Sequence, residues 1–284
     1  MTSSTPKVSV CIPTYNGEKF IAQTIESILN QSFDDFELII SDDGSTDKTL
    51  EIVRSFRDSR ISRIDSLAKV GPEANWNNSV VNARGELIKL ICQDDLLYRQ
   101  CLEQEVSAMA SPQNKDVSFC FGLRDFVTPN GRIIKGRRVS GKGDARFNKS
   151  QFLKKVVRSG GNPVGEPMAV TFRRSAFEQA GKFHGDYVID LAMWVSLIEF
   201  GPAIFVNQRL SAFRISKTSW TASLKDSQTN SVRALAKIIF DQNPTLISRT
   251  DLVRGRLIGS VRAFVRQTAS RLILFVDHFF RSAG

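Results

Sequence analysis

Few residues in this chain are suited to binding zinc or to forming disulfides. Only two of the 284 residues are histidine, and the four cysteines form no C-x-x-C pair. The cysteines are Cys11, Cys92, Cys101 and Cys120. A histidine-rich zinc site is therefore not expected. Scattered cysteines without a paired pattern are typical of a reduced compartment, which predicts a cytoplasmic protein.

The sequence also lacks the patterns of membrane insertion, of secretion and of two common modes of phosphate binding. No apolar run approaches the roughly 20 residues of a spanning helix, and MTSSTPKVSVCIP does not resemble a signal peptide. There is no G-x-x-x-x-G-K-[ST] loop, and no G-x-G-x-x-G follows the first strand-like run. Binding of nucleotide phosphates by a P-loop or a dinucleotide fingerprint is therefore not expected.

Acidic and basic side chains are separated along the chain, whose net charge is +10. Residues 1–130 carry 13 basic and 19 acidic side chains, whereas residues 131–158 carry 10 basic and one acidic. An acidic front half suggests a site for a metal cation, and the basic segment suggests phosphate groups or an anionic surface. Basic residues that only solvate loops and helix faces are an equal alternative.

Strand-like and helix-like segments alternate through the first 120 residues. The expected strands are Lys7–Ile12, Phe36–Ile40, Arg60–Ile64 and Glu86–Cys92. The expected helices are Glu18–Leu29, Thr46–Phe56, Glu73–Ala83 (ended by Gly85 as a cap) and Gln100–Ala110. This alternation predicts an α/β fold with a parallel, doubly wound sheet, in which ligands bind beyond the carboxyl ends of the strands. Three polar loops fall at that edge: Thr14-Tyr15-Asn16, Asp42-Asp43 and Asp94-Asp95.

Two adjacent carboxylates, Asp94 and Asp95, follow the fourth expected strand. Like charges side by side repel each other and are costly to bury unless a cation shares the site. Such a pair can hold Mg²⁺ or Mn²⁺ while water and substrate phosphates fill the other positions. We therefore expect Mn²⁺ or Mg²⁺ as cofactor. The alternative is that Asp95 caps the following helix.

Asp42 and Asp43 lie in a turn after the second expected strand. Their carboxylates could accept hydrogen bonds from a nucleobase N–H or from ribose hydroxyls. Asp-Asp-Gly-Ser is also a common turn sequence, so a purely structural role is the alternative. The joint placement of both acid pairs with Pro13-Thr14-Tyr15-Asn16 favours a functional edge.

The second half of the chain is less regular. Strands are expected at Val117–Phe121 and Ala169–Phe172, a basic loop at Arg132–Lys149, and an amphipathic helix at Asp190–Phe200. Beyond about residue 222 the pattern is helical to the end, although Gly255 and Gly259 weigh against one continuous helix. The chain is therefore expected to divide into a body over residues 1–222 and a basic helical extension over residues 223–284.

Several stretches together resemble the family 2 glycosyltransferases. VSVCIPTYNGEKFIAQTIESILNQSFDDFELIISDDGSTDKT resembles the N-terminal signature of that family, and VGPEANWNNSVVNARGELIKLICQDD resembles its helix and aspartate motif. NPVGEPMAVTFRRSAFEQAGKF is similar to its acceptor-side strand and turn, and DLAMWVSLIEFG to the helix that carries its base. The resemblance covers about residues 7–220. It implies a GT-A fold, with a nucleotide-sugar half over 1–120 and an acceptor half over 121–222.

The resemblance also implies roles for single residues. Asp42 and Asp43 would contact the base and ribose, Asp94 the ribose or a metal-bound water, and Asp95 the metal. Asp190 would be the general base, although an ordinary helix cap is the alternative. The further positions implied to bind the nucleotide sugar are Pro13, Thr14, Tyr15, Asn16, Asn75 and Arg214. The implied reaction is a metal-assisted transfer that inverts the anomeric carbon, while Asp190 takes the proton of an acceptor hydroxyl.

The chain departs from the family pattern at two positions. Ile189 stands where the family has the glutamate of a Glu-Asp pair, and Ser216 stands where many relatives have histidine. Because this histidine is absent, its contact with the metal or diphosphate would fall to Arg214 or Lys217. A non-catalytic nucleotide-sugar-binding or scaffolding subunit therefore stays as the alternative to an inverting, hexosyltransferase-type enzyme. A nucleotidyltransferase would need a glycine-rich loop after the first strand.

The basic extension bears on location and partners. Leu252–Phe280 interleaves arginine with apolar residues, which is typical of a helix at an anionic membrane surface. A packed helix with a solvated cationic face and a dimer interface are the alternatives. The acidic front half disfavours nucleic acid as a partner. We expect a cytoplasmic enzyme, peripheral to the inner face of the membrane, with a glycan or lipid-linked saccharide as acceptor and a role in building a cell-surface polysaccharide or glycolipid.

Overall fold

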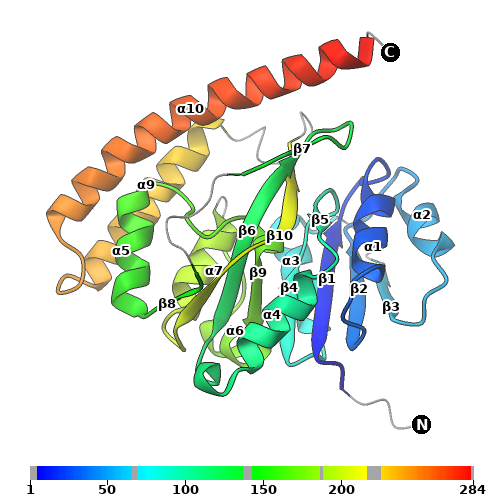
Figure 1. Ribbon diagram of the computed structural model, residues 1–284, viewed down its shortest axis with the longest axis horizontal. Coiled ribbons are helices and arrows are strands. Elements are labelled where there is room, and N and C mark those ends of the chain that lie inside the picture. The colour runs from blue at the N-terminus through cyan, green and yellow to red at the C-terminus, as the bar shows by residue number, and fades with distance from the viewer. Residues whose placement is uncertain (1–4, 66–68, 137–142, 186–187, 216–224, 283–284) are drawn as a thin grey trace.

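The computed structural model describes residues 5–65, 69–136, 143–185, 188–215 and 225–282 as an α/β protein built around one sheet (Figure 1). The strands are β1 (Val8–Thr14), β2 (Phe36–Asp42), β3 (Ile61–Asp65), β4 (Leu87–Leu90), β5 (Leu96–Leu97), β6 (Phe119–Val127), β7 (Ile133–Ile134), β8 (Ala145–Phe147), β9 (Val170–Arg173) and β10 (Ala203–Arg214). The helices are α1 (Ile21–Leu29), α2 (Thr49–Ser55), α3 (Pro72–Val81), α4 (Cys101–Ala110), α5 (Lys149–Ser159), α6 (Arg174–Ala180), α7 (Ile189–Leu197), α9 (Lys225–Gln242) and α10 (Arg249–Ser282), with 3-10 turns η1 (Pro112–Asn114) and η2 (Pro167–Ala169).

The strand order along the sheet is β3-β2-β1-β4-β9-β6-β10-β5. The four strands of the front half pair in parallel, as the strand–helix alternation predicts. The carboxyl ends of these strands therefore lie at one edge of the sheet. The other half is mixed, because β9 runs antiparallel to both β4 and β6 whereas β6 and β10 are parallel.

Both faces of β1, β2 and β4 are buried, and their side chains alternate between two apolar clusters. Val8, Val10 and Ile12 of β1 belong to one cluster, whereas Cys11 belongs to the other. Helices α1, α2 and α4 contribute to the first cluster, and α3, α5, α6 and α7 to the second. The period-two alternation of a strand explains why these runs are apolar throughout: each face meets a helical layer.

Strand β1 extends through Pro13 to Thr14, two residues past its expected end at Ile12. Pro13 pairs in register with Ser41 of β2, whereas the β1–β4 ladder ends at Cys11. Proline is tolerated where the ladder on one side has stopped, because its missing N–H is not needed there. As a result β1 carries Thr14 to the edge beside Asp42.

Strand β10 was not predicted from the sequence, although it lies inside the sheet between β6 and β5. In its second half, polar and apolar residues do not alternate strictly. The register against β6 also shifts twice between Val206 and Ser211. A bulged strand loses the period-two pattern on which sequence analysis depends. The expected strand over Val117–Phe121 likewise runs on to Val127.

The basic segment after residue 131 is not the loop that was predicted. It contains β7 and β8, and α5 begins at Lys149. Asn148 caps α5 reciprocally with Gln151, and Phe152, Leu153, Val156 and Val157 are buried in the core. The residues between 137 and 142 lie outside the described part of the chain.

Gly85 is not the cap of the third helix. That helix, α3, ends with Asn82 as its cap. A Cβ at Gly85 would lie 2.5 Å from the backbone nitrogen of Ser9, so glycine is needed there for the close approach of the chain to β1.

The tail forms two helices rather than one run, and α10 is continuous through both of its glycines. A Cβ at Gly255 would lie 2.0 Å from the carbonyl oxygen of Val157, and one at Gly259 would lie 2.7 Å from that of Gly160. The two glycines therefore let α10 pack closely on the end of α5. The expected domain boundary at residue 222 falls outside the described residues and stays a prediction.

Candidate active site at the carboxyl edge of the sheet

The loop after β1 is held to the loop after β4 by the amide of Gln93. Its Oε1 accepts hydrogen bonds from the Thr14 hydroxyl and from the Tyr15 backbone N–H (2.8 Å), and its Nε2 donates to the Tyr15 carbonyl (3.0 Å). The Tyr15 ring stays about one-third exposed, with the Lys69 ammonium 4.0 Å from its centre. Gln93, which sequence analysis did not single out, thus joins two of the three predicted loops.

Asn16 connects the first loop to the second. It adopts a left-handed backbone conformation (φ 49°), its N–H donates to the Ser45 hydroxyl (2.9 Å), and its Oδ1 accepts from Thr46 N–H (2.9 Å). Asparagine tolerates this conformation better than most residues. In this structure Asn16 shapes the edge, and its expected contact with a ligand stays a prediction.

Asp42 and Asp43 are both buried, and each carboxylate binds the protein itself. Asp42 accepts from the Ser45 N–H and hydroxyl at 2.8 and 2.5 Å, which is the turn geometry offered as the alternative. Asp43 accepts from the backbone N–H groups of Val70 (2.6 Å) and Gly71 (3.0 Å). The pair therefore organises two loops at the edge, and its contact with a base or ribose stays a prediction.

Asn75 lies beneath the same edge on α3. Its Oδ1 accepts from the Ser41 hydroxyl (2.7 Å) and its Nδ2 donates to the Thr14 carbonyl (3.2 Å). The side chain is 4% exposed. Asn75 thus ties the ends of β1 and β2 together from below.

Arg214, the last residue of β10, is fully buried under the acidic loop after β4. Its Nε donates to the Asp94 carbonyl (2.6 Å), one terminal nitrogen donates to the Thr128 carbonyl (3.1 Å), and its guanidinium carbon lies 4.2 Å from the centre of the Phe20 ring. Burial lowers the pKa of this guanidinium, whereas the charges of Asp94 and Asp95 raise it by a smaller amount. In this structure Arg214 positions the acidic loop. Ser216 and Lys217, the other candidates for a diphosphate contact, lie outside the described residues.

Asp95 has one buried carboxylate oxygen without a hydrogen-bond partner in the described part of the chain, Oδ2. Its Oδ1 accepts from Arg214 N–H (2.9 Å). Burial raises the pKa of Asp95, the Asp94 carboxylate raises it further, and burial also raises the pKa of Asp94. Asp95 is not a helix cap, because β5 follows it and α4 begins only at Cys101.

These features fit a divalent cation. An unpartnered buried carboxylate oxygen beside a second carboxylate is costly unless a cation shares the site. Within the described residues there is no group of three or more carboxylate, thiol or imidazole side chains that could hold a metal ion. Mg²⁺ and Mn²⁺ suit such a site, since phosphate and water oxygens commonly fill their remaining positions.

Asp190 lies at the start of α7, where Asn162 holds one of its oxygens. The Asn162 amide nitrogen donates to Asp190 Oδ2 (2.8 Å), and Asn162 Oδ1 accepts from the N–H groups of Val164 and Gly165, both at 3.0 Å. The helix cap is Val188, in a left-handed conformation unusual for a β-branched residue (φ 50°), so Asp190 does not cap the helix. Burial raises the pKa of Asp190 to about 7.

The charges of four carboxylates, from three separate segments of the chain, act on the half-buried thiol of Cys92. Burial raises the pKa of this thiol, and Asp95, Asp94, Asp190 and Glu166 raise it further in that order. The fold thus brings the predicted metal position and the predicted base into one electrostatic environment. Sequence analysis missed Glu166, although it lies in the quoted stretch NPVGEP.

Glu166 also forms an ion pair at this site. It binds Arg124 of β6, and its charge raises the pKa of Asp190 while that of Arg124 lowers it. No local sequence pattern pointed to a role for Arg124. It lies in β6, and the strand predicted there from the sequence ends at Phe121, before Arg124.

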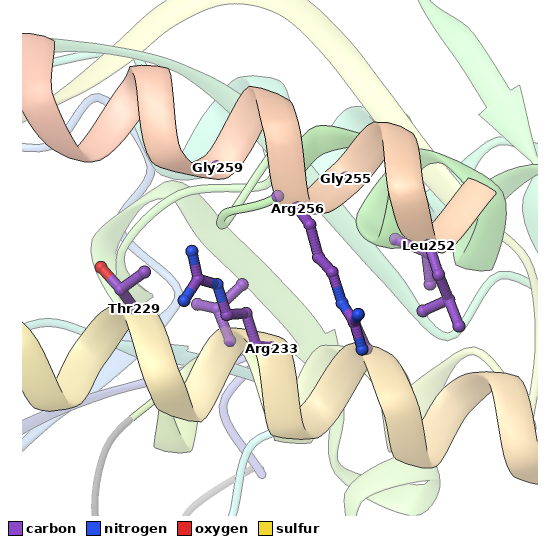
Figure 2. A pocket seen from close by; sticks show the side chains of 10 residues that line it. Thr229, Arg233, Leu252, Gly255, Arg256 and Gly259 are labelled. Carbon is purple, nitrogen blue, oxygen red and sulfur yellow. The ribbon is translucent and has the colours of Figure 1, made fainter. Parts of the chain in front are cut away.

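The cavity in Figure 2 lies away from this edge, between α5, α9 and α10. Its volume is about 20 Å³, which suffices for one water molecule. It is a packing gap beside the glycine contact of α10 with α5 and is separate from the candidate active site.

Comparison with known proteins identifies the class of this fold and its family. The structure of S. aureus TarS 1–349 in complex with UDP-GlcNAc aligns with a TM-score of 0.65 and 18% identity, over 82% of this chain and 66% of that one. The mannosyltransferase PcManGT from Pyrobaculum calidifontis, in complex with GDP-Man and Mn²⁺, aligns with a TM-score of 0.57 and 16% identity, over 99% and 86%. The fold is the GT-A fold, as expected.

The sequence profile of glycosyl transferase family 2 matches residues 9–181, which is more than half of the chain. The chain therefore belongs to that family, as its motifs predicted.

Two relatives with described activities are similar over part of their length. The GalNAc(5)-diNAcBac-PP-undecaprenol beta-1,3-glucosyltransferase of Campylobacter jejuni is 30% identical over 216 residues, 74% of this chain and 65% of that enzyme. The UDP-Glc:alpha-D-GlcNAc-diphosphoundecaprenol beta-1,3-glucosyltransferase WfgD of Escherichia coli is 31% identical over 136 residues, 47% of this chain and 53% of that enzyme. In the described part of this chain, no helix is both long enough and apolar enough to cross a bilayer.

Proposed function

We propose that this protein transfers a sugar from a nucleoside-diphosphate sugar to a hydroxyl group of a lipid-linked glycan, with inversion at the anomeric carbon. The observation that carries the proposal is the arrangement of Asp190: a carboxylate held through one oxygen, whose charge acts on the same thiol, that of Cys92, as the charges of Asp94 and Asp95. Membership of the family and the undecaprenol-linked acceptors in the names of two relatives support the choice of reaction and acceptor.

The base step follows from the chemistry of Asp190. Asn162 holds the carboxylate through Oδ2, and the same carboxylate would accept the proton of the attacking hydroxyl. The bond from the acceptor oxygen to the anomeric carbon forms as the bond from that carbon to the diphosphate oxygen breaks. A pKa of about 7 suits a general base at neutral pH, because the carboxylate is ionised yet basic enough to take a proton.

The leaving diphosphate needs positive charge near it. Asp95, with Asp94 beside it, would hold a Mg²⁺ or Mn²⁺ ion, which supplies that charge when bound. Arg214 keeps the acidic loop in place from below. The donor-side residues Thr14 and Tyr15, fixed by Gln93, would line the nucleotide pocket.

The location follows from the acceptor. A lipid-linked saccharide stays at the membrane, so we place the enzyme at the inner, cytoplasmic face of a bilayer as a peripheral protein. The same acceptor class places the reaction in the synthesis of a cell-envelope polysaccharide or glycolipid.

Release of nucleoside diphosphate tests the function. The enzyme is incubated with Mn²⁺ or Mg²⁺, a panel of UDP-, GDP- and dTDP-sugars and a crude lipid-linked acceptor fraction. Turnover is expected for wild type, to depend on the metal, and to be lost in Asp95→Ala and Asp190→Asn. Asp58→Asn, a surface carboxylate paired with Arg60, is the matched control. Nucleotide-sugar binding without turnover on every donor would instead support a non-catalytic subunit.

A further inference from the structure

One face of α10 exposes large apolar side chains to solvent. Val253, Leu257, Val261, Phe264 and Val265 are 56%, 66%, 64%, 72% and 57% exposed, respectively. Their spacing of four, four, three and one residues places them along one side of a helix. These five residues, the outer stripe, form a contiguous apolar surface of the kind that marks a contact with a partner.

The outer stripe points away from the protein because the opposite face of α10 is already used. Asp251, Gly255 and Gly259 are buried, and Asp251 binds Arg158 of α5 at 2.5 Å. The close contact of Gly255 with the Val157 carbonyl leaves no room for α10 to roll about its axis. The rotation of the helix, and hence the direction of the stripe, is therefore fixed by packing.

The charges beside the outer stripe are positive. By helical spacing Arg254 and Arg262 lie along one edge of it, and both are exposed, whereas Arg256 reaches toward α9 at the cavity (Figure 2). The sequence has no aspartate or glutamate between Asp251 and Asp277. A second copy packed along this face would bring two positively charged surfaces together, which is unfavourable. An anionic surface instead complements an apolar stripe flanked by cations.

The helix also lies on the functional side of the molecule. Figure 1 shows α10 (orange to red) crossing the side toward which β1 runs, so the helix and the carboxyl edge of the sheet are on the same side. A surface that contacts α10 would therefore lie on the side of the molecule to which the loops after these strands belong.

We propose that α10 lies in the interface of an anionic bilayer, with the outer stripe inserted among the acyl chains and the flanking arginines at the lipid phosphates. This inference deepens the proposed function, on which it rests for its purpose: a lipid-linked acceptor would reach the site from the bilayer that the helix contacts. The contact itself requires neither donor nor turnover, so it can be tested separately.

Co-sedimentation with vesicles tests the contact, using phosphatidylglycerol mixed with phosphatidylcholine, and phosphatidylcholine alone. Wild type is expected to sediment with the anionic vesicles, less at high salt, since added salt screens surface charge. Leu257→Asp and Phe264→Asp should each weaken the partition at least about tenfold, because each places a charge where apolar surface is buried. Val81→Asp, at a valine on α3 that is 56% exposed, is the matched control and should bind as wild type does.

Two further readouts separate this proposal from its alternatives. Circular dichroism melts and metal-dependent nucleoside-diphosphate release without vesicles should be unchanged in all three variants. If Leu257→Asp and Phe264→Asp bind anionic vesicles as wild type does, or if wild type does not bind them, the inference is overturned. It is also overturned if light scattering shows a dimer that these variants dissociate, since the outer stripe then contacts a second copy.

Discussion

Replacing Asp190 by asparagine is expected to abolish turnover and at the same time to stabilise the fold above neutral pH. The substitution keeps the shape of the side chain and leaves Asn162 an oxygen to donate to, but it removes the carboxylate that takes the proton. It also removes a charge that the fold has partly withdrawn from water. The two effects have opposite signs, which makes the variant informative.

The size of the stabilisation follows from the pKa. The Asp190 carboxyl has a pKa of about 7 in the fold, raised by burial from 3.8. Between these values the folded protein keeps a proton that the unfolded chain has lost, so stability falls as the pH rises through this window, and the full cost is present above about pH 7. A shift of about three units corresponds to about 4 kcal/mol. Partial solvent contact of the carboxylate lowers the expected gain to about 2 kcal/mol.

Urea unfolding of wild type and Asp190→Asn at about pH 5 and about pH 8 measures this difference, which should be larger at the higher pH. The control, Asp58→Asn, should show the opposite sign. Arg60 lowers the pKa of Asp58, so its ionised form stabilises the fold at neutral pH and is lost only in acid. In wild type, kcat/KM should rise with pH to a plateau above about 7. Turnover retained by Asp190→Asn, or a variant no more stable at high pH, would refute the reasoning.

Three further predictions concern single contacts. Asn162→Ala should lower kcat about 10- to 100-fold and move the midpoint of the pH–rate profile upward, because the ionised base loses a donor; an unchanged profile would contradict the positioning role. Lys89→Met should cost about 3–5 kcal/mol in urea unfolding, because it leaves Glu105, 2.6 Å from Lys89 in the fully buried pair, without its counter-charge; a loss below about 1 kcal/mol would argue against a charged pair. Gly255→Ala should cost about 1–3 kcal/mol and increase hydrogen exchange in α10, because its Cβ would meet a backbone carbonyl; unchanged exchange would show that the helix can shift without loss.

Local patterns predicted the front half well because its contacts repeat in short units. The runs that became β1, β2 and β4 are apolar on both faces and bounded by turn residues, and each is followed by a helix pattern. Parallel pairing then placed the predicted acidic loops at one edge. The predicted ends of the helices and strands differ from the observed ends by a few residues. Helix α1, for example, begins at Ile21, whereas Glu18 was predicted.

The acceptor side was harder to predict because its key contacts join residues far apart in sequence. Glu166 and Arg124 are ordinary charged residues until β6 and the loop before η2 bring them together beside Asp190. Arg214 likewise gains its role only because β10 enters the sheet and ends beneath Asp94. The bulges of β10 removed the alternation that would have indicated a strand.

By itself, the sequence determined the family, the α/β alternation and the acidic residues at the strand ends, because these are encoded in adjacent residues and short periodicities. Only the tertiary structure decided which carboxylate oxygen has no partner among the described residues, which amide holds Asp190 and which face of α10 meets solvent. The Oδ2 atom of Asp95, the Asn162–Asp190 hydrogen bond and the glycine contact of α10 with α5 are all set by packing between distant segments. Such packing selects one arrangement among many that the same local pattern permits.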